Sequence, residues 1–225
     1  MELYKPFDFL TPEECREIVK YTKTHPIYNS GVSDAVKHNE DIGLGGGHAV
    51  NYHDNPDEKI KTDVPTNVWI DGKKYKQGAY VDKEYRKSTA CRLYDKKYRK
   101  KLLDMFKSFD QKLIIDEIPE IIIYQPGDFF NWHTDHLVWK RRHWLRLRDW
   151  ERVLSVTVEL QPEDNAGLYF DYRLHPNIPR THDYRPVPLK QGQAIVFKCT
   201  DMHRVANNGK QTRISLVASG SKAVE

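Results

Sequence analysis

Residues 120–135 read EIIIYQPGDFFNWHTD and combine two strand-like runs with a turn between them. The first run, 120–125, is dominated by isoleucine, and the second, 129–135, is aromatic. Pro126-Gly127-Asp128 separates them, and such a cluster is a typical turn signal. The stretch therefore predicts two neighbouring strands.

More strand-like runs follow this stretch, whereas helical patterns precede it. We expect further strands at 153–160, 168–172, 187–189, 193–198 and 211–219, separated by turn residues such as those at 162–165 and 207–209. Helices first, followed by many short strands with no helix between them, predict an antiparallel double-sheet barrel or jelly roll supported by helices. The fold class is thus mainly β with supporting helices, with the β core at 113–220.

Two helices are predicted before the strands. The first starts at Thr11 as N-cap, with Pro12 in the first helical position and Glu14 completing a capping box. The second covers about 95–110, where one stripe is apolar and the other face is rich in lysine. Both are expected to be scaffold helices.

The region between these helices, 28–87, is polar and has little periodicity. Residues 68–75 predict a hairpin around Asp71-Gly72, and the glycine-rich residues 43–47 lack the Lys-Ser or Lys-Thr of a phosphate-binding loop. A mobile flap and a plain surface loop are both open for this region. We expect a single domain over 1–225, with 1–112 supplying the helices and the flap-like part.

Three residues have the pattern of a metal site. His133 and Asp135 are two apart in a predicted strand, so their side chains point to the same face. His203 follows the strand at 193–198 in a short loop and supplies a second imidazole. Two histidines and one carboxylate form the facial triad of non-haem Fe(II) oxygenases, which leaves open positions for a cosubstrate and dioxygen. These three residues are the predicted metal ligands and catalytic centre.

Arg213 is the predicted binding residue for the cosubstrate. It lies ten residues after His203, on the face of strand 211–219 that also carries Ser215. A guanidinium inside a barrel needs a carboxylate partner, and its planar fork suits a bidentate acid. The distal carboxylate of 2-oxoglutarate would be that partner. Tyr124 would add a phenolic hydrogen bond, and Ser215 a second contact.

These motifs together resemble a known family. The segments 124–135, 154–158 and 192–197, followed by His203 and Arg213-Ile214-Ser215, are similar to the iron(II)/2-oxoglutarate-dependent dioxygenase superfamily, particularly its prolyl 4-hydroxylase-like branch. The resemblance covers about 121–219. It implies a double-stranded β-helix core of the cupin-like type, with Fe(II), 2-oxoglutarate, dioxygen and ascorbate. It also implies hydroxylation of a C–H bond coupled to decarboxylation of 2-oxoglutarate to succinate.

The sequence departs from that branch at two places. Arg213 stands where many prolyl hydroxylases carry lysine, and Ala166-Gly167 stands where they have a glycine pair. Both departures bear on the substrate rather than on the cosubstrate. Related halogenases replace the metal-binding carboxylate with a small residue, so the presence of Asp135 favours a hydroxylase.

Composition limits the class of protein. Thirty-six Lys and Arg residues against 32 Asp and Glu residues give a net charge of +4, and the three cysteines form no C-x-x-C pair. No apolar run is as long as the roughly 18 residues of a membrane span, and the first residues lack the pattern of a signal peptide. We therefore expect a cytoplasmic protein with no membrane partner.

Basic residues and tryptophans alternate at 138–152, shortly after the predicted metal-binding strand. This segment is expected near the rim of the active site, where it would contact substrate or a partner, or form an ordinary lid. The preferred substrate is amino-acid-like, either a peptidyl residue such as proline or a free small metabolite. One alternative is a dioxygenase that modifies or demethylates nucleic acid. A second alternative is a non-catalytic metal-binding β-barrel interaction module.

Overall fold

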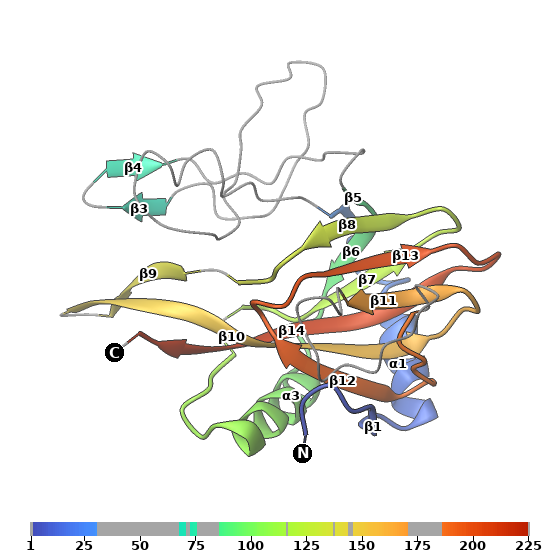
Figure 1. The fold of residues 1–225 in the computed structure, drawn as a ribbon, viewed down its shortest axis with the longest axis horizontal. Helices are drawn as coiled ribbons and strands as arrows, with labels where there is room; N and C mark the ends of the chain where they lie inside the picture. The colour runs from blue at the N-terminus through green and yellow to red at the C-terminus, as the bar shows by residue number, and fades with distance from the viewer. Residues whose placement is uncertain are drawn as a thin grey trace.

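The computed structural model describes residues 2–30, 68–70, 73–75, 86–115, 117–136, 138–143, 146–170 and 186–224. Within these residues the chain forms two facing antiparallel sheets with two helices on one side, as Figure 1 shows. This arrangement confirms the predicted jelly-roll class.

The larger sheet has eight strands. In the order in which they pair, they are β1 (Phe7–Asp8), β12 (Gln193–Lys198), β10 (Arg146–Gln161), β14 (Arg213–Ala223), β7 (Glu120–Tyr124), β6 (Thr89–Arg92) and β2 (Tyr28–Asn29), while β9 (Val138–His143) pairs with β10. The smaller sheet has the order β11 (Ala166–Phe170), β13 (His203–Asn207), β8 (Phe129–His133) and β5 (Arg86–Lys87). Separately, β3 (Val68–Ile70) pairs antiparallel with β4 (Lys73–Tyr75), which confirms the predicted strand pairing, while the predicted turn residues Asp71-Gly72 lie outside the described residues.

The two helices cover the outer face of the larger sheet. Helix α1 (Pro12–Tyr21) has the predicted capping box, in which Thr11 accepts a hydrogen bond from the Glu14 N–H while Glu14 accepts one from the Thr11 N–H. Helix α3 (Lys96–Phe109) is capped by Asp95. Its buried stripe, which includes Leu102 and Phe106, packs on the sheet together with residues of α1. Both helices are therefore scaffold, as predicted.

Alternation along the strands separates two cores. The outer core, under the helices, includes Ile214, Leu216 and Ala218 of β14. A second cluster joins residues of both sheets, such as Tyr124 and Phe170, and therefore lies between them. Since side chains alternate along a strand, Arg213 and Ser215 face this inner layer.

Some predicted strands differ from the observed ones. Strand β10 begins at Arg146 rather than at 153, because the basic segment pairs with β9 as a hairpin that continues the sheet. The expected strand at 187–189 is wrong: these residues are not in a strand, although the Val187 N–H donates to the Leu168 carbonyl. Residues 43–47 and most of the flap-like region lie outside the described residues.

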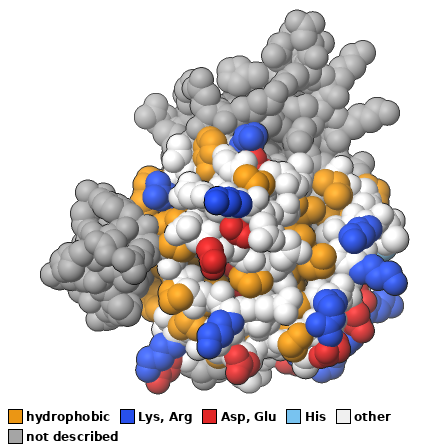
Figure 2. Space-filling view, turned by 90° about the vertical axis from the view of Figure 1, so that its right-hand side faces the viewer, with side chains coloured by type: hydrophobic (Ala, Val, Ile, Leu, Met, Phe, Trp, Pro, Cys, Tyr) orange, Lys and Arg blue, Asp and Glu red, His pale blue; other side chains and the backbone are white. Residues whose placement is uncertain are grey.

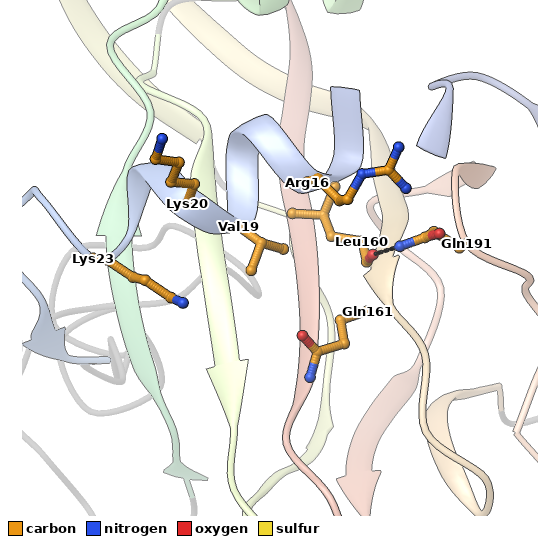
Figure 3. Close-up of a pocket in the computed structure, with 7 residues that line it drawn as sticks. All are labelled: Arg16, Val19, Lys20, Lys23, Leu160, Gln161 and Gln191. Atoms are coloured by element: carbon orange, nitrogen blue, oxygen red, sulfur yellow. Dashed lines mark hydrogen bonds between the residues drawn. The ribbon is translucent and has the colours of Figure 1, made fainter. Parts of the chain in front are cut away.

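The surface carries charges of both signs. On the face in Figure 2, the described lysine and arginine side chains are interspersed with acidic and uncharged ones. A surface hollow of about 390 Å³ lies between α1 and the end of β10, with Arg16, Lys20 and Lys23 on its rim and Leu160 in its wall (Figure 3). Leu160 belongs to the outer core, so this hollow opens on the helix side of the sheet. None of the described helices has the length and apolar character needed to cross a bilayer.

Candidate active site

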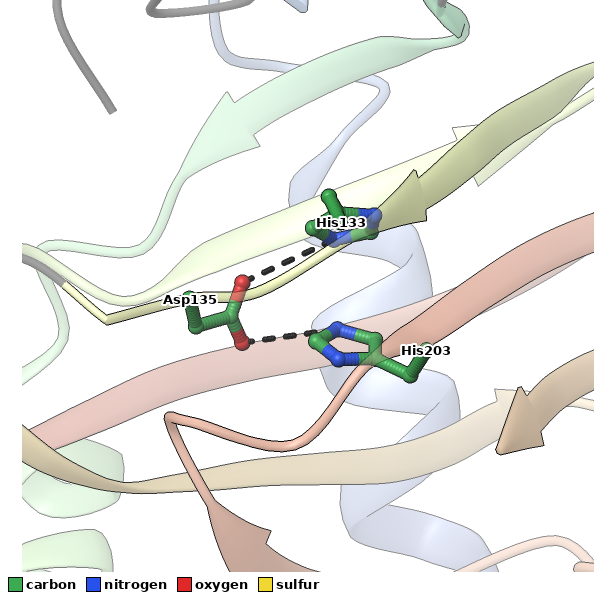
Figure 4. A group of neighbouring side chains, drawn as sticks. All are labelled: His133, Asp135 and His203. Carbon is green, nitrogen blue, oxygen red and sulfur yellow. Dashed lines mark ion pairs between the residues drawn. The ribbon is translucent and has the colours of Figure 1, made fainter. Parts of the chain in front are cut away.

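The three predicted metal ligands come together between the sheets. His133 is the last residue of β8 and His203 the first of β13, and the two face each other in the strand register. His133 Nε2 lies 3.6 Å from Asp135 Oδ1, and His203 Nε2 lies 3.6 Å from Asp135 Oδ2 (Figure 4). One ligand atom from each residue lies within 4.8 Å of the other two. The predicted convergence is therefore present.

Two details of the expected placement are corrected. His203 was expected in a loop, but it begins β13, because pairing with β8 and β11 extends the smaller sheet to this position. Asp135 was expected in the same strand as His133, but β8 ends at His133 and Asp135 follows it outside the strand. Asp135 still reaches both rings, so strand alternation alone does not account for the site.

Backbone carbonyls orient both histidine rings. His133 Nδ1 lies 2.6 Å from the Asn131 carbonyl oxygen, and His203 Nδ1 lies 2.9 Å from the Asp201 carbonyl oxygen. When each Nδ1–H donates to its carbonyl, the neutral tautomer leaves Nε2 with a free lone pair. Both Nε2 atoms face Asp135, which is the orientation that a shared cation requires.

Aromatic side chains pack against the rings and limit their rotation. Phe130 stacks on His133, with ring centroids 3.4 Å apart, and Phe197 meets His203 edge-on at 4.8 Å. Both histidine side chains are almost fully buried. The site is thus rigid on its histidine side.

Asp135 is held in its ionised form. Burial raises the pKa of this carboxyl, but positive charge on His203 and His133, which the rings carry when protonated, and a hydrogen bond from Ser155 together bring it below its usual range. When the rings are neutral, a bound cation would take over this electrostatic role. Ser155 Oγ donates to Asp135 Oδ2 at 2.6 Å and also lies 3.1 Å from Cys199 Sγ. An ionised carboxylate with two neutral imidazole nitrogens is a donor set that suits Fe(II).

The spacing of the donors also fits one ion. Neighbouring ligands bound to a common ion at about 2.1 Å lie roughly 3 Å apart, which is close to the two observed separations of 3.6 Å. Among the described residues, this is the group of His, Cys, Asp and Glu side chains that has such spacing. His136 lies outside this group, with its Nε2 4.0 Å from Glu151 Oε2.

The predicted cosubstrate residues line the inner layer. Arg213 is fully buried on β14, directly opposite Tyr124 of β7 in the register, and its guanidinium carbon lies 5.6 Å from the centroid of the Tyr124 ring. Burial raises the pKa of Tyr124, so this phenol is protonated. Ser215 is buried one inward position further along β14.

Arg213 has a carboxylate partner that the sequence analysis did not identify. Its Nε and Nη2 donate to the same oxygen of Glu159, Oε2, at 3.1 Å and 2.7 Å. We expected the cosubstrate to supply the carboxylate that neutralises Arg213. In the protein without cosubstrate, Glu159 supplies it instead. The sequence carried only part of this signal: Ser155, Thr157 and Glu159 alternate with apolar residues and thus share one face of β10, but no local pattern pairs Glu159 with Arg213.

Asp201 links the strand β12 to the His203 end of β13. Its Oδ2 accepts hydrogen bonds from the Tyr4 hydroxyl at 2.6 Å and from the Lys198 N–H at 3.1 Å. Its carbonyl oxygen is the one that orients His203. Sequence reasoning missed Asp201 and Tyr4, which are 197 residues apart, because no local pattern joins them.

The basic segment at 138–152 forms the β9–β10 hairpin, which extends beyond the two-sheet body in Figure 1. The side chains of 137–149 lie outside the described residues, so the predicted contact of this segment with substrate stays a prediction. Arg152 at its end donates to the Asp135 carbonyl oxygen at 3.4 Å and pairs with Glu117. This end of the hairpin therefore borders the metal site.

Comparison with known proteins agrees with this geometry. Residues 119–218 match the family model of the 2OG-Fe(II) oxygenase superfamily. No curated protein sequence matches the chain.

Two solved structures share the fold. The viral collagen prolyl hydroxylase from Paramecium Bursaria Chlorella virus-1, in its 2OG complex, is 15% identical with a TM-score of 0.50, and the match covers 98% of this chain and 97% of that one. A prolyl-4-hydroxylase from Pseudomonas putida is 14% identical with a TM-score of 0.51, over 97% of this chain and 91% of that one. Residues 119–218, which hold the three converging side chains, are therefore similar to the 2OG-Fe(II) oxygenase superfamily, and the two solved structures show the same fold.

Proposed function

We propose that the protein is an Fe(II)/2-oxoglutarate-dependent hydroxylase in which His133, Asp135 and His203 bind the iron. The observation that carries this proposal is the convergence of two oriented Nε2 atoms and an ionised carboxylate in one buried site. Three protein ligands on one side of an ion leave its other positions open for a cosubstrate and dioxygen. A bound Fe(II) would activate dioxygen, which is the oxidant that inserts oxygen into a C–H bond while 2-oxoglutarate is decarboxylated.

The cosubstrate is 2-oxoglutarate, which is converted to succinate and CO₂. Arg213 Nη1 has no hydrogen-bond partner among the described residues and lies in the inner layer, so it is available to the distal carboxylate. The protonated Tyr124 hydroxyl adds a donor for the same group, and Ser215 a further contact. Fixing the far end of the cosubstrate in this way would align its keto-acid end with the iron.

The other residues keep the site in order. The Asn131 and Asp201 carbonyls hold protons on the Nδ1 atoms, so Nε2 stays a metal ligand, and Ser155 orients the Asp135 carboxylate. The aromatic rings of Phe130 and Phe197 exclude water from the histidine side. Ascorbate is proposed to maintain the iron in its ferrous form.

The proposed substrate is amino-acid-like, either a peptidyl residue such as proline or a free small metabolite. This proposal is supported by the prolyl hydroxylases that share the fold. The retained Asp135 supports hydroxylation rather than halogenation, since it leaves no vacancy for chloride.

The test is a screen of amino acids, proline-containing peptides and oligonucleotides with Fe(II), 2-oxoglutarate and ascorbate. We expect succinate together with a product that has gained one oxygen atom, both lost in His133→Ala and both retained in the matched control His136→Ala. Oxidation of an oligonucleotide alone would replace our substrate class with nucleic acid. No succinate with any substrate, although the protein is folded and binds Fe(II), would favour a non-catalytic module.

A further inference from the structure

Arg213 and Glu159 form a buried ion pair, and the proposed reaction gives Glu159 no role. Glu159 approaches the guanidinium through Oε2 alone, which accepts from both Nε and Nη2. Both side chains are buried to within a few per cent of full burial. Glu159 Oε1 and Arg213 Nη1 each have no partner among the described residues. Two strong hydrogen-bonding atoms in this buried layer therefore have no partner in the described part of the chain.

The pair lies on the same face as the metal site. Glu159 and Ser155 are four residues apart on β10, so their side chains share one face, and Ser155 binds the metal-site carboxylate of Asp135. Across the sheet, Glu159 lies opposite Ser215. Glu159 therefore belongs to the layer in which the cosubstrate is proposed to bind.

Charge in this layer sets a constraint. Arg213 and an ionised Glu159 already sum to zero, so the distal carboxylate of 2-oxoglutarate would add an uncompensated negative charge. Two carboxylates on one guanidinium repel each other, and burial makes the repulsion costly. Burial raises the pKa of Glu159, while Arg213, the charged group that faces it from β14, acts in the opposite direction. A proton on Glu159 would remove the conflict and allow its hydroxyl to donate to the cosubstrate.

We propose that Glu159 is a positioning residue that competes with 2-oxoglutarate for Arg213 and thereby sets the affinity of the enzyme for its cosubstrate. This inference rests on the proposed function of Arg213. In the protein alone Glu159 neutralises Arg213 and holds it through Nε and Nη2, so that Nη1 stays directed to the cosubstrate. When 2-oxoglutarate binds, Glu159 takes up one proton from solvent and the site returns to electrical neutrality.

The sign of the resulting pH dependence follows from proton linkage. A site that takes up a proton on binding loses affinity as pH rises, by at most about tenfold per pH unit for one proton. Affinity for 2-oxoglutarate is therefore highest at low pH, where Glu159 is already neutral. The affinity for 2-oxoglutarate falls with rising pH. The fall ends at the pH above which Glu159 is ionised in the complex as well as in the free enzyme.

The experiment is anaerobic titration calorimetry of the Fe(II)-loaded enzyme with 2-oxoglutarate, between about pH 6 and about pH 8, in buffers of different ionisation enthalpy. For the natural protein we expect uptake of close to one proton and a Kd that increases with pH. For Glu159→Gln, which keeps an acceptor but removes the charge, we expect no such uptake and a Kd at least about tenfold lower at the upper pH. KM for 2-oxoglutarate should fall in the same ratio, with kcat little changed.

The matched control is Glu163→Gln, which neutralises a carboxylate beyond the end of β10 that accepts a backbone N–H from Lys210. It should titrate like the natural protein. Equal or weaker 2-oxoglutarate binding by Glu159→Gln would overturn the inference, and so would a pH-independent Kd for the natural protein, which needs no variant. If the natural protein does not bind 2-oxoglutarate in the presence of Fe(II), the proposed function itself fails.

Discussion

At the scale of single residues, the site is defined by hydrogen bonds that leave specific atoms free. Both histidines use Nδ1 on a backbone carbonyl, which leaves Nε2 to face the Asp135 carboxylate. The carboxylate in turn is oriented by Ser155. Removing such an outer partner of a metal ligand typically costs 10- to 100-fold in metal affinity or activity.

Ser155→Ala tests this arrangement. We expect Fe(II) affinity to fall by about tenfold, because Asp135 loses the donor that holds its Oδ2. Anaerobic equilibrium dialysis with Fe(II) gives the dissociation constants. Ser219→Ala is the control, since Ser219 lies directly across from Ser155 on β14, whereas the hydrogen bond to Asp135 comes from Ser155. Equal losses in the two variants would show that Ser155 does not act through Asp135.

The sequence predicted the residues of the triad better than their surroundings. His133 and Asp135 could be recognised because they are two residues apart, and His203 because it completes the two-histidine, one-carboxylate donor set and has Arg213 ten residues after it. Glu159 could not be assigned as the partner of Arg213, because the two are 54 residues apart and meet only through the pairing of β10 with β14. Long-range contacts of this kind depend on strand order, which local periodicity does not contain.

At the scale of elements, strand β10 connects the two cores, because one of its faces packs under the helices and the other contributes side chains to the inner layer. Val156, Val158 and Leu160 pack under the helices, whereas Ser155 and Glu159 serve the inner layer. The sequence predicted a strand at 153–160 but did not assign its two faces. The sequence did not predict that β10 begins as early as Arg146. This part of the strand pairs with β9 through its backbone, and its basic residues do not form a strand-like pattern.

Helix α3 supplies the second test. Leu102→Ala should lower the free energy of unfolding by about 3 kcal/mol, because this fully buried side chain fills the outer core. Leu103→Ala, at a partly buried neighbour, should cost only about 1 kcal/mol. Urea denaturation measures both. The turnover of 2-oxoglutarate by the folded fraction should not change in either variant, because α3 packs on the outer face; a loss of turnover in folded Leu102→Ala would show that the two layers are coupled.

At the scale of the whole molecule, burial determines which thiols can react with reagents in solution. All three cysteines of the chain are buried and free. Burial raises the pKa of each thiol, for Cys15 to about 11. Because the thiolate is the reactive form, only about one Cys15 in a thousand is reactive at pH 8 even where reagent can reach it.

We therefore expect no cysteine to react quickly with a thiol-reactive disulfide reagent at pH 8 in the folded protein. After denaturation, three thiols per chain should react. Mass spectrometry of the labelled protein counts the modified residues. Rapid labelling of Cys199, which lies beside Ser155, would show that reagent reaches the metal site from solvent.

The central claim is that His133, Asp135 and His203 bind one Fe(II). The most direct measurement is an anaerobic titration of the metal-free protein with Fe(II), with bound iron counted per chain. The account predicts one tightly bound Fe(II) in the natural protein and in His136→Ala, and none at the same concentration in His203→Ala. A folded natural protein that binds no Fe(II), or a His203→Ala variant that binds it equally well, would contradict the account.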